Sequence, residues 1–261
     1  MKENREIHMA DLLIPITLLA FIFAAVAFFY ASVGLGGGSS YTALLAIFGA
    51  STVTIPMVSL TLNILVTTFG SIVFLLYGHA RLRLIAPFIF ASIPMAYLGG
   101  MLQLPKTVFY LLLMVSLCVA AARIYFPNSQ RPLKLGQHGK ILLALGGGAL
   151  LGLIAGITGI GGGVYLVPLI LLLGLGNPKE AAACGAFFIW VKSVSGLLAR
   201  LQFSEIDLTS YLPLVFGAVL GGMLGTLMGA GRFQVRTMQR ILGSILIVAI
   251  LMLGRKIALL A

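Results

Sequence analysis

The chain has 261 residues, of which 60% are hydrophobic and only 9% are charged. Its mean hydropathy of +1.12 excludes a soluble globular protein and indicates a protein that crosses a membrane several times. The net charge is +11, but Lys and Arg are spread between apolar runs, so we expect no nucleic-acid partner. Cys118 and Cys184 lie inside apolar runs, away from any metal-ligand spacing, so we expect no disulfide, metal or cofactor.

Apolar runs of about the length that spans hydrocarbon follow one another along the chain. The first run is too long for the apolar core of a signal peptide, so we expect a retained helix there. Two further runs are too short to cross alone and are predicted to be half-helices. The predicted spans are 12–33, 55–77, 84–104 and 107–125, then 141–157, 181–199, 208–230 and 238–253; the half-helices are 41–48 and 165–173.

Two motifs occur twice, in the same order. Gly34-Leu-Gly-Gly-Gly-Ser39 and Gly159-Ile-Gly-Gly-Gly-Val164 are 125 residues apart, and Leu98-Gly-Gly-Met-Leu102 recurs as Leu220-Gly-Gly-Met-Leu224 at a spacing of 122. This repetition predicts a duplication, with a first transmembrane repeat at 1–126, a polar, proline-containing linker at 127–138 and a second transmembrane repeat at 139–261. The predicted fold is all-α, with four spanning helices and one half-helix in each repeat.

The relative direction of the two repeats depends on whether the half-helices count as crossings. Four crossings per repeat would make the repeats parallel, whereas five would make them inverted. The positive-inside rule does not decide, because the best orientation of each arrangement places nearly the same number of Lys and Arg residues inside. Broken helices at mid-membrane favour the inverted arrangement.

The glycine-rich segments are candidate substrate sites. Successive glycines let the backbone bend, and a helix that begins after the bend presents free N–H groups and the positive end of its dipole to an anion. The alternative is that these glycines only permit close helix crossing. The candidate binding residues are Gly36, Gly37, Gly38, Ser39 and Ser40 in the first segment and Gly161, Gly162, Gly163 and Val164 in the second.

Lys192 is a charged residue deep inside a predicted span, and no predicted span contains an internal carboxylate that could pair with it. An anionic substrate would supply the missing counter-charge, whereas the alternative is a structural lysine bonded to backbone carbonyls. Asn63 is a second candidate, either for substrate binding or for holding helices together. Lys192 and Ser195 lie three residues apart, which also leaves a membrane-embedded hydrolase open.

Other glycines recur every four residues and predict smooth helix faces for close packing. These are Gly148, Gly152 and Gly156 in one span and Gly217, Gly221, Gly225 and Gly229 in another.

The chain resembles the sulfite exporter TauE/SafE family over nearly its whole length. The second half carries the fuller match, in Gly159-Ile-Gly-Gly-Gly163, Val167-Pro168, Asn177-Pro178 and the acidic Glu205-Ile-Asp207. The first half departs from the family pattern at Tyr41-Thr42-Ala43 and at His79-Ala-Arg-Leu-Arg83. The resemblance implies a carrier for sulfite, sulfonates or related sulfur oxyanions in a bacterial inner membrane.

We therefore expect a multi-pass membrane protein that transports small sulfur oxyanions by alternating access. Export is the expected direction, because an inside-negative potential drives anions outward at about 2.3 kcal/mol per charge per 100 mV. An anion channel and a Ser/Lys hydrolase remain alternatives. The expected partners are a small anionic substrate and the lipid bilayer, and a homodimer is left open.

Overall fold

The computed structural model describes residues 15–79, 81–125, 136–203, 209–231 and 235–258, and this part of the chain is helical and contains no strand. The all-α prediction is therefore confirmed. The elements in chain order are α1 (Ile16–Ala31), α2 (Gly38–Ile47), α3 (Thr54–Leu76), α4 (Leu82–Met101), α5 (Lys106–Tyr125), α6 (Gln137–Thr158), α7 (Gly163–Leu172), α8 (Pro178–Arg200), the short 3-10 helix η2 (Thr209–Tyr211), α9 (Leu212–Gly231) and α10 (Val235–Ala258).

Several of these helices are long and apolar enough to cross a membrane. Among the described residues, five segments meet both conditions, namely Thr54–Leu76, Arg83–Met101, Gln137–Thr158, Pro178–Arg200 and Thr209–Gly229. Large apolar side chains also face outward, as Phe21 and Phe90 do with 76% and 79% of their surface exposed. In a soluble protein such a surface would be unfavourable, whereas hydrocarbon accommodates it. The protein is therefore a multi-pass membrane protein.

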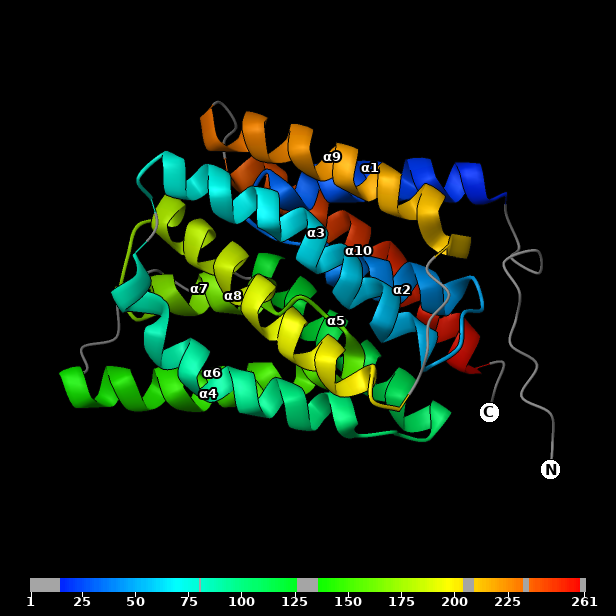
Figure 1. Ribbon diagram of the computed structural model, residues 1–261, viewed down its shortest axis with the longest axis horizontal. Coiled ribbons are helices and arrows are strands. Elements are labelled where there is room, and N and C mark those ends of the chain that lie inside the picture. The colour runs from blue at the N-terminus through cyan, green and yellow to red at the C-terminus, as the bar shows by residue number, and fades with distance from the viewer. Residues whose placement is uncertain (1–14, 80, 126–135, 204–208, 232–234, 259–261) are drawn as a thin grey trace.

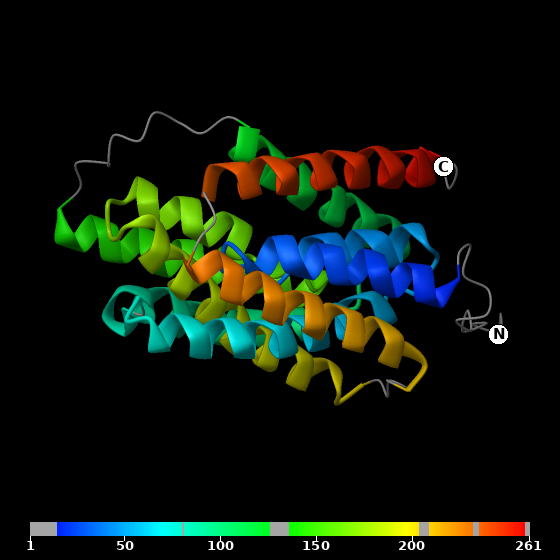
Figure 2. The ribbon, with the colours of Figure 1, turned by 90° about the horizontal axis from the view of Figure 1, so that it is seen from above.

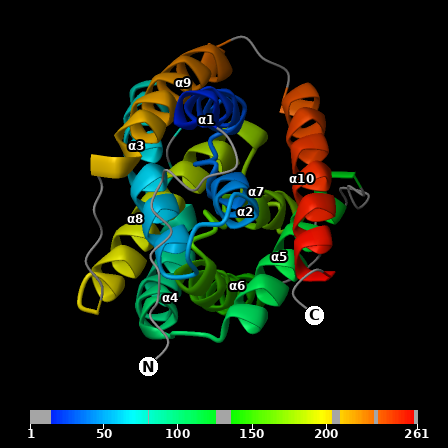
Figure 3. The same ribbon diagram turned by 90° about the vertical axis from the view of Figure 1, so that its right-hand side faces the viewer.

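The long helices surround two short ones. Seen along the bundle, α2 and α7 lie inside a ring formed by the other helices (Figure 3). Both short helices follow a glycine-rich segment, and the chain reverses there, so that α2 and α7 run back toward the ends where α1 and α6 begin (Figures 1 and 2). We call the end of the bundle where α1 begins the α1 end, and the opposite end, where α6 begins, the α6 end.

The two halves of the chain have the same order of long and short helices, but they run in opposite directions. In Figure 1, α1 runs from right to left and α6 from left to right. The start of α1 and the last described turn of α10 consequently lie at the same end (Figures 1 and 2).

Glycines bring helices from different halves into close contact. A Cβ atom at Gly148, Gly152 or Gly156 of α6 would meet the backbone of Phe88, Ser92 or Ala96 of α4, and each of these three pairs advances by four residues in the same direction. The glycines of α9 lie in the same way against α1, where Cβ atoms at Gly217, Gly221, Gly225 and Gly229 would meet Ala20, Ala24, Phe28 and Ser32. The predicted packing role of both glycine series is confirmed, and both pairs of helices are parallel.

The start of α8 is fixed by a complete capping box. Asn177 accepts a hydrogen bond from the Glu180 N–H, the Glu180 side chain accepts one from the Asn177 N–H, and Pro178 occupies the first turn. This cap sets the register of the helix that carries Lys192. Most of the predicted linker 127–138 and the acidic segment Glu205-Ile-Asp207 lie outside the described residues.

Candidate functional site

Each glycine-rich segment forms a sharp bend because its backbone adopts left-handed conformations. The φ angles are +77° at Gly34 and +91° at Gly37 in the first bend, and +77° at Gly159 and +60° at Gly162 in the second. Side chains of L-residues rarely adopt these values, so glycine is required at these positions. The bends end α1 and α6 in the interior and let α2 and α7 start there.

The two bends touch each other at the centre of the bundle. A Cβ atom at Gly38 would lie 2.6 Å from the backbone nitrogen of Gly161 and would overlap the Asn63 amide. Ser59 ties the bends together, since its hydroxyl donates to the Gly38 carbonyl at 3.2 Å and to the Gly159 carbonyl at 3.0 Å. Candidates that lie more than 120 residues apart in the sequence thus meet at one place.

Asn63 of α3 lies between the two bends and is fully buried. Its Nδ2 donates to the Gly159 carbonyl at 3.3 Å, while its Oδ1 has no hydrogen-bond partner among the described residues. A Cβ atom at Gly36 would lie 2.6 Å from this oxygen. A buried polar atom without a partner carries a penalty of about 1–3 kcal/mol. A bound O–H or N–H group would remove that penalty.

Lys192 of α8 reaches the second bend from the other side. The side chain is 1% exposed, and its Nζ donates to the Ile160 carbonyl at 3.0 Å and lies 5.4 Å from the centre of the Phe188 ring. Glu180 is the one acidic residue within the described ranges. It lies in the first turn of α8, about 18 Å from Lys192 along the helix. The ammonium therefore has no carboxylate partner in the part of the chain that the structure describes.

Backbone N–H groups add to this positive potential. A Cβ atom at Gly162 would lie 2.5 Å from Lys192 Nζ, so the ammonium lies directly against the second bend. Several N–H groups of the two bends make no backbone hydrogen bond within the described residues, and they lie at the starts of α2 and α7, where the helix dipoles are positive. They belong to Gly36, Gly37, Gly38 and Ser39 in the first bend and to Gly161, Gly162 and Val164 in the second.

The remaining candidates have other roles in this conformation. The hydroxyls of Ser39 and Ser40 contact the hydroxyl of Tyr30, at 2.8 and 2.9 Å, so they join α2 to α1. Gly163 begins α7 and lies against Ile189 and Leu35.

Sequence reasoning missed a second buried cation beside the second bend. Arg200, the last residue of α8, is 8% exposed, and its Nη2 donates to the carbonyls of Gly156 and Ile157 at 2.8 and 2.6 Å. Lys192 and Arg200 thus both bind carbonyl groups near the interrupted C-terminal end of α6. The sequence contains a signal for this role, because an arginine that directly follows a predicted span is well placed to reach back into the bundle.

The geometry does not pair Lys192 with Ser195. The Ser195 hydroxyl donates to the Ile93 carbonyl of α4 at 2.8 Å, whereas Lys192 faces the second bend. The arrangement that a lysine-activated serine requires, with its nucleophile and base in hydrogen-bond contact, does not occur between these two residues.

Comparisons with known proteins identify a family of membrane transporters. The sequence matches the family model "Sulfite exporter TauE/SafE" over residues 18–253. The chain is similar to the probable membrane transporter protein y4hK of Sinorhizobium fredii, with 34% identity over 235 residues that cover 88% of this chain and 95% of the relative. The probable membrane transporter protein YunE of Bacillus subtilis is 35% identical over 98 residues, which are 38% of this chain and 36% of the relative. No solved structure matches the chain. The protein therefore belongs to the sulfite exporter TauE/SafE family of membrane transporters.

Proposed function

We propose that this transporter carries small sulfur oxyanions across the membrane by alternating access, with the two bends, Asn63 and Lys192 as the binding centre. The observation that carries the proposal is the meeting of a buried ammonium with the starts of two interior helices. An oxyanion such as sulfite offers several oxygens to N–H donors and a negative charge to Lys192. The described residues of the centre hold hydrogen-bond donors and a positive charge but no carboxylate, so such an anion would supply the missing acceptors and negative charge.

We infer that the two halves are inverted repeats, at 1–126 and 139–261, joined by the linker 127–138. The opposite directions of α1 and α6 support this relation (Figure 1). Thr68 and Trp190 are 122 residues apart, the spacing of the Leu-Gly-Gly-Met-Leu motifs, and the Trp190 indole N–H donates to the Thr68 hydroxyl at 2.9 Å. Contact between equivalent positions is the geometry expected where a pseudo-two-fold axis passes between α3 and α8.

The proposed mechanism requires the centre to exchange its internal hydrogen bonds for bonds to the anion. In the present conformation the Ile160 carbonyl holds Lys192, and the contact between Gly38 and Gly161 closes the centre. A bound anion would draw the ammonium away from this carbonyl and separate the bends. This closed centre supports a carrier over an open channel, because a channel needs a continuous path when it conducts.

The proposed orientation places the α6 end in the cytoplasm of a bacterium, so that the anion is exported through the inner membrane. Among the described residues, the helix ends at the α6 end carry Arg81, Arg83, Arg123, Lys140, Lys179, Arg236 and Arg240, whereas those at the α1 end carry Lys106, Arg200, Arg255 and Lys256. Lys and Arg are enriched on the cytoplasmic side of membrane proteins. Outward movement of an anion then follows the membrane potential and needs no coupling ion.

Flux into proteoliposomes tests the proposal. Purified wild-type protein is expected to give saturable sulfite flux with counterflow, because a carrier exchanges its substrate. Lys192→Met should lower the flux at least about tenfold, because a lost hydrogen bond to a charged group is worth about 1.5–3 kcal/mol. Lys179→Met, on the exposed first turn of the same helix, is the matched control and should stay within about twofold of wild type. Unchanged flux in Lys192→Met would refute the role of this lysine.

A further inference from the structure

The side-chain oxygen of Asn63 is framed by glycines of both bends. Cβ atoms built at Gly36, Gly38 and Gly161 would lie 2.6, 2.9 and 3.5 Å from Asn63 Oδ1. Glycine has no side chain at these positions, so the backbones of the two bends cover this oxygen directly while they touch. Separation of the bends, which the proposed cycle requires, would uncover it.

The amide of Asn63 has a defined orientation. Its Nδ2 donates to the Gly159 carbonyl at 3.3 Å, and the same carbonyl accepts a hydrogen bond from the Ser59 hydroxyl at 3.0 Å. A reversed amide would place Oδ1 against this carbonyl oxygen, where two acceptors repel each other. The atom that remains without a partner is therefore an amide oxygen, which accepts hydrogen bonds and cannot donate them.

Tyr41 provides a second polar side-chain atom at the bends that has no partner among the described residues. The side chain is fully buried, and its ring stacks on that of Phe23 at 5.0 Å between the ring centres. A Cβ atom at Gly37 would lie 2.6 Å from the hydroxyl oxygen. A hydroxyl can donate to the oxygen of any oxyanion. Asn63 Oδ1, in contrast, requires a ligand that carries a hydrogen.

The charge of the centre favours an anion with a single negative charge. Lys192 supplies one ammonium, whereas Arg200 lies eight residues further along α8, about 12 Å away, and binds the carbonyls at the end of α6. The described residues of the centre include no carboxylate, so a monoanion would make the loaded centre neutral. A dianion would leave one uncompensated charge inside the membrane, which is unfavourable.

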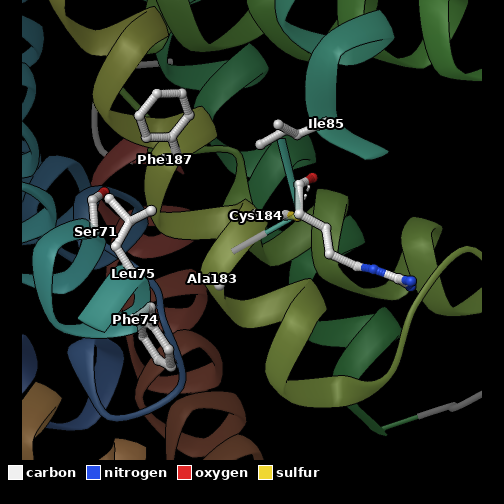
Figure 4. A pocket seen from close by; sticks show the side chains of 8 residues that line it. Ser71, Phe74, Leu75, Ile85, Ala183, Cys184 and Phe187 are labelled. Atoms are coloured by element: carbon white, nitrogen blue, oxygen red, sulfur yellow. Dashed lines mark hydrogen bonds between the residues drawn. The ribbon is translucent and has the colours of Figure 1, made fainter. Parts of the chain in front are cut away.

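An unpartnered polar atom alone does not make an anion site. The Ser71 hydroxyl of α3 also has no partner among the described residues, but Ser71 lines a small pocket between α3, α4 and α8 (Figure 4). The walls of this pocket are mainly apolar, as Phe74 and Phe187 illustrate, and it has room for about one water molecule. Asn63 differs because its free oxygen lies where the two bends meet beside a buried ammonium.

We propose that the centre selects a singly charged sulfur oxyanion that carries one hydrogen-bond donor, and that Asn63 Oδ1 is the group that recognises this donor. Of the two forms of sulfite that coexist near neutral pH, the selected one is hydrogensulfite, HO–SO2−, and not the dianion. Its hydroxyl donates to Asn63 Oδ1, while its other oxygens accept from Lys192 and from N–H groups of the bends. This inference rests on the proposed function, because it specifies which anion that centre carries.

Methanesulfinate, CH3–SO2−, is the matched probe, because it has the charge and shape of hydrogensulfite with a methyl group in place of the hydroxyl. The flux of labelled sulfite into proteoliposomes would be measured at one mildly acidic pH, and each competing anion would be described by the concentration that halves this flux. Methanesulfinate should require at least about ten times the concentration of unlabelled sulfite, since a site with an unpaired polar group rejects an analogue that lacks the matching group. Sulfate, which has two charges and no hydrogen at this pH, should compete even less well.

The variants test whether Asn63 is the source of this preference. Asn63→Leu removes the acceptor with little change in volume, so the halving concentrations of methanesulfinate and sulfite should come within about threefold of each other. Tyr41→Phe, which keeps the ring on Phe23, and Ser59→Ala, which loses the hydrogen bonds to both bends, are the matched controls. Both should keep the preference of at least about tenfold for sulfite, whatever their total flux, because neither removes the acceptor.

The outcomes distinguish this inference from the proposed function. Equal competition by methanesulfinate and sulfite in the wild type would overturn the selection of a donor, and so would a preference that persists in Asn63→Leu, while sulfite transport itself would stand. Equal competition by sulfate and methanesulfinate would overturn the selection of a single charge. The wild-type comparisons need no variant, so the test does not depend on the folding of Asn63→Leu. The absence of saturable flux for every sulfur oxyanion would overturn both proposals.

Discussion

Gly38→Ala is the most direct test of the contact between the two bends. The added Cβ would lie 2.6 Å from the Gly161 nitrogen and against the Asn63 amide. Ordinary contacts begin at 3.4 Å, so the bends would have to separate by about 0.8 Å. Overpacking of this kind costs about 1–3 kcal/mol. Because Gly38 has no left-handed φ angle, the substitution acts through this clash and not through backbone strain.

The clash occurs only when the bends touch, so the substitution should depopulate the closed centre. A penalty of about 1–3 kcal/mol corresponds to a factor of about 5 to 150 in that equilibrium. We therefore expect sulfite flux in proteoliposomes to decrease by a factor of about 5 to 150. Gly146→Ala is the matched control, because nothing lies within 4 Å of its added Cβ and alanine favours the helix by up to about 1 kcal/mol. Flux at the wild-type level in both variants would refute the idea that contact between the bends is part of the transport cycle.

Three further predictions concern assembly, stability and orientation. Gly225→Leu should prevent α9 from lying against the Phe28 backbone and should give aggregated protein on size-exclusion chromatography in detergent; a monodisperse, active variant would contradict the proposed packing. Asn177→Ala removes the cap of α8, so it should lower stability by about 1 kcal/mol and the unfolding temperature by about 2–4 °C, and an unchanged melting temperature would show that the cap contributes nothing. In a protein without native cysteines, Gln137→Cys should react with an impermeant thiol reagent from the cytoplasmic side and Gln202→Cys from the outer side. Labelling of both cysteines from the same side would contradict the inverted arrangement.

The helices were largely predictable because their signals are local. The predicted run 55–77 and α3 (Thr54–Leu76) differ by one residue at each end, since hydrophobicity and length are properties of consecutive residues. The glycine bends were predictable for the same reason. The relative direction of the halves was not fixed by the charge rule, because the best parallel and the best inverted arrangements place nearly the same number of Lys and Arg residues inside.

The contacts of the candidate site were harder to predict than its members. Lys192 and Asn63 were identified as unusual residues within apolar runs, and the structure brings both to the bends. Tyr30 was missed because a tyrosine in an apolar run gives no sign that its hydroxyl will form hydrogen bonds with the hydroxyls of Ser39 and Ser40. Arg200, which directly follows the predicted span 181–199, was also missed, although its side chain returns to the end of α6. Such pairings depend on how distant helices cross, which a single sequence does not specify.

Thermal unfolding in the presence of anions tests the central claim most directly, since a ligand that binds only the folded state raises its stability by about 2.7 kcal/mol at 100 times its Kd. The purified protein would be heated with sulfite, thiosulfate, sulfate, taurine, sulfoacetate or chloride at matched ionic strength. The account predicts that one sulfur oxyanion raises the melting temperature of the wild type and of Lys179→Met, while Lys192→Met shows no such shift. A shift that persists in Lys192→Met, or that chloride produces equally well, would contradict a sulfur oxyanion site formed by Lys192 and the two bends.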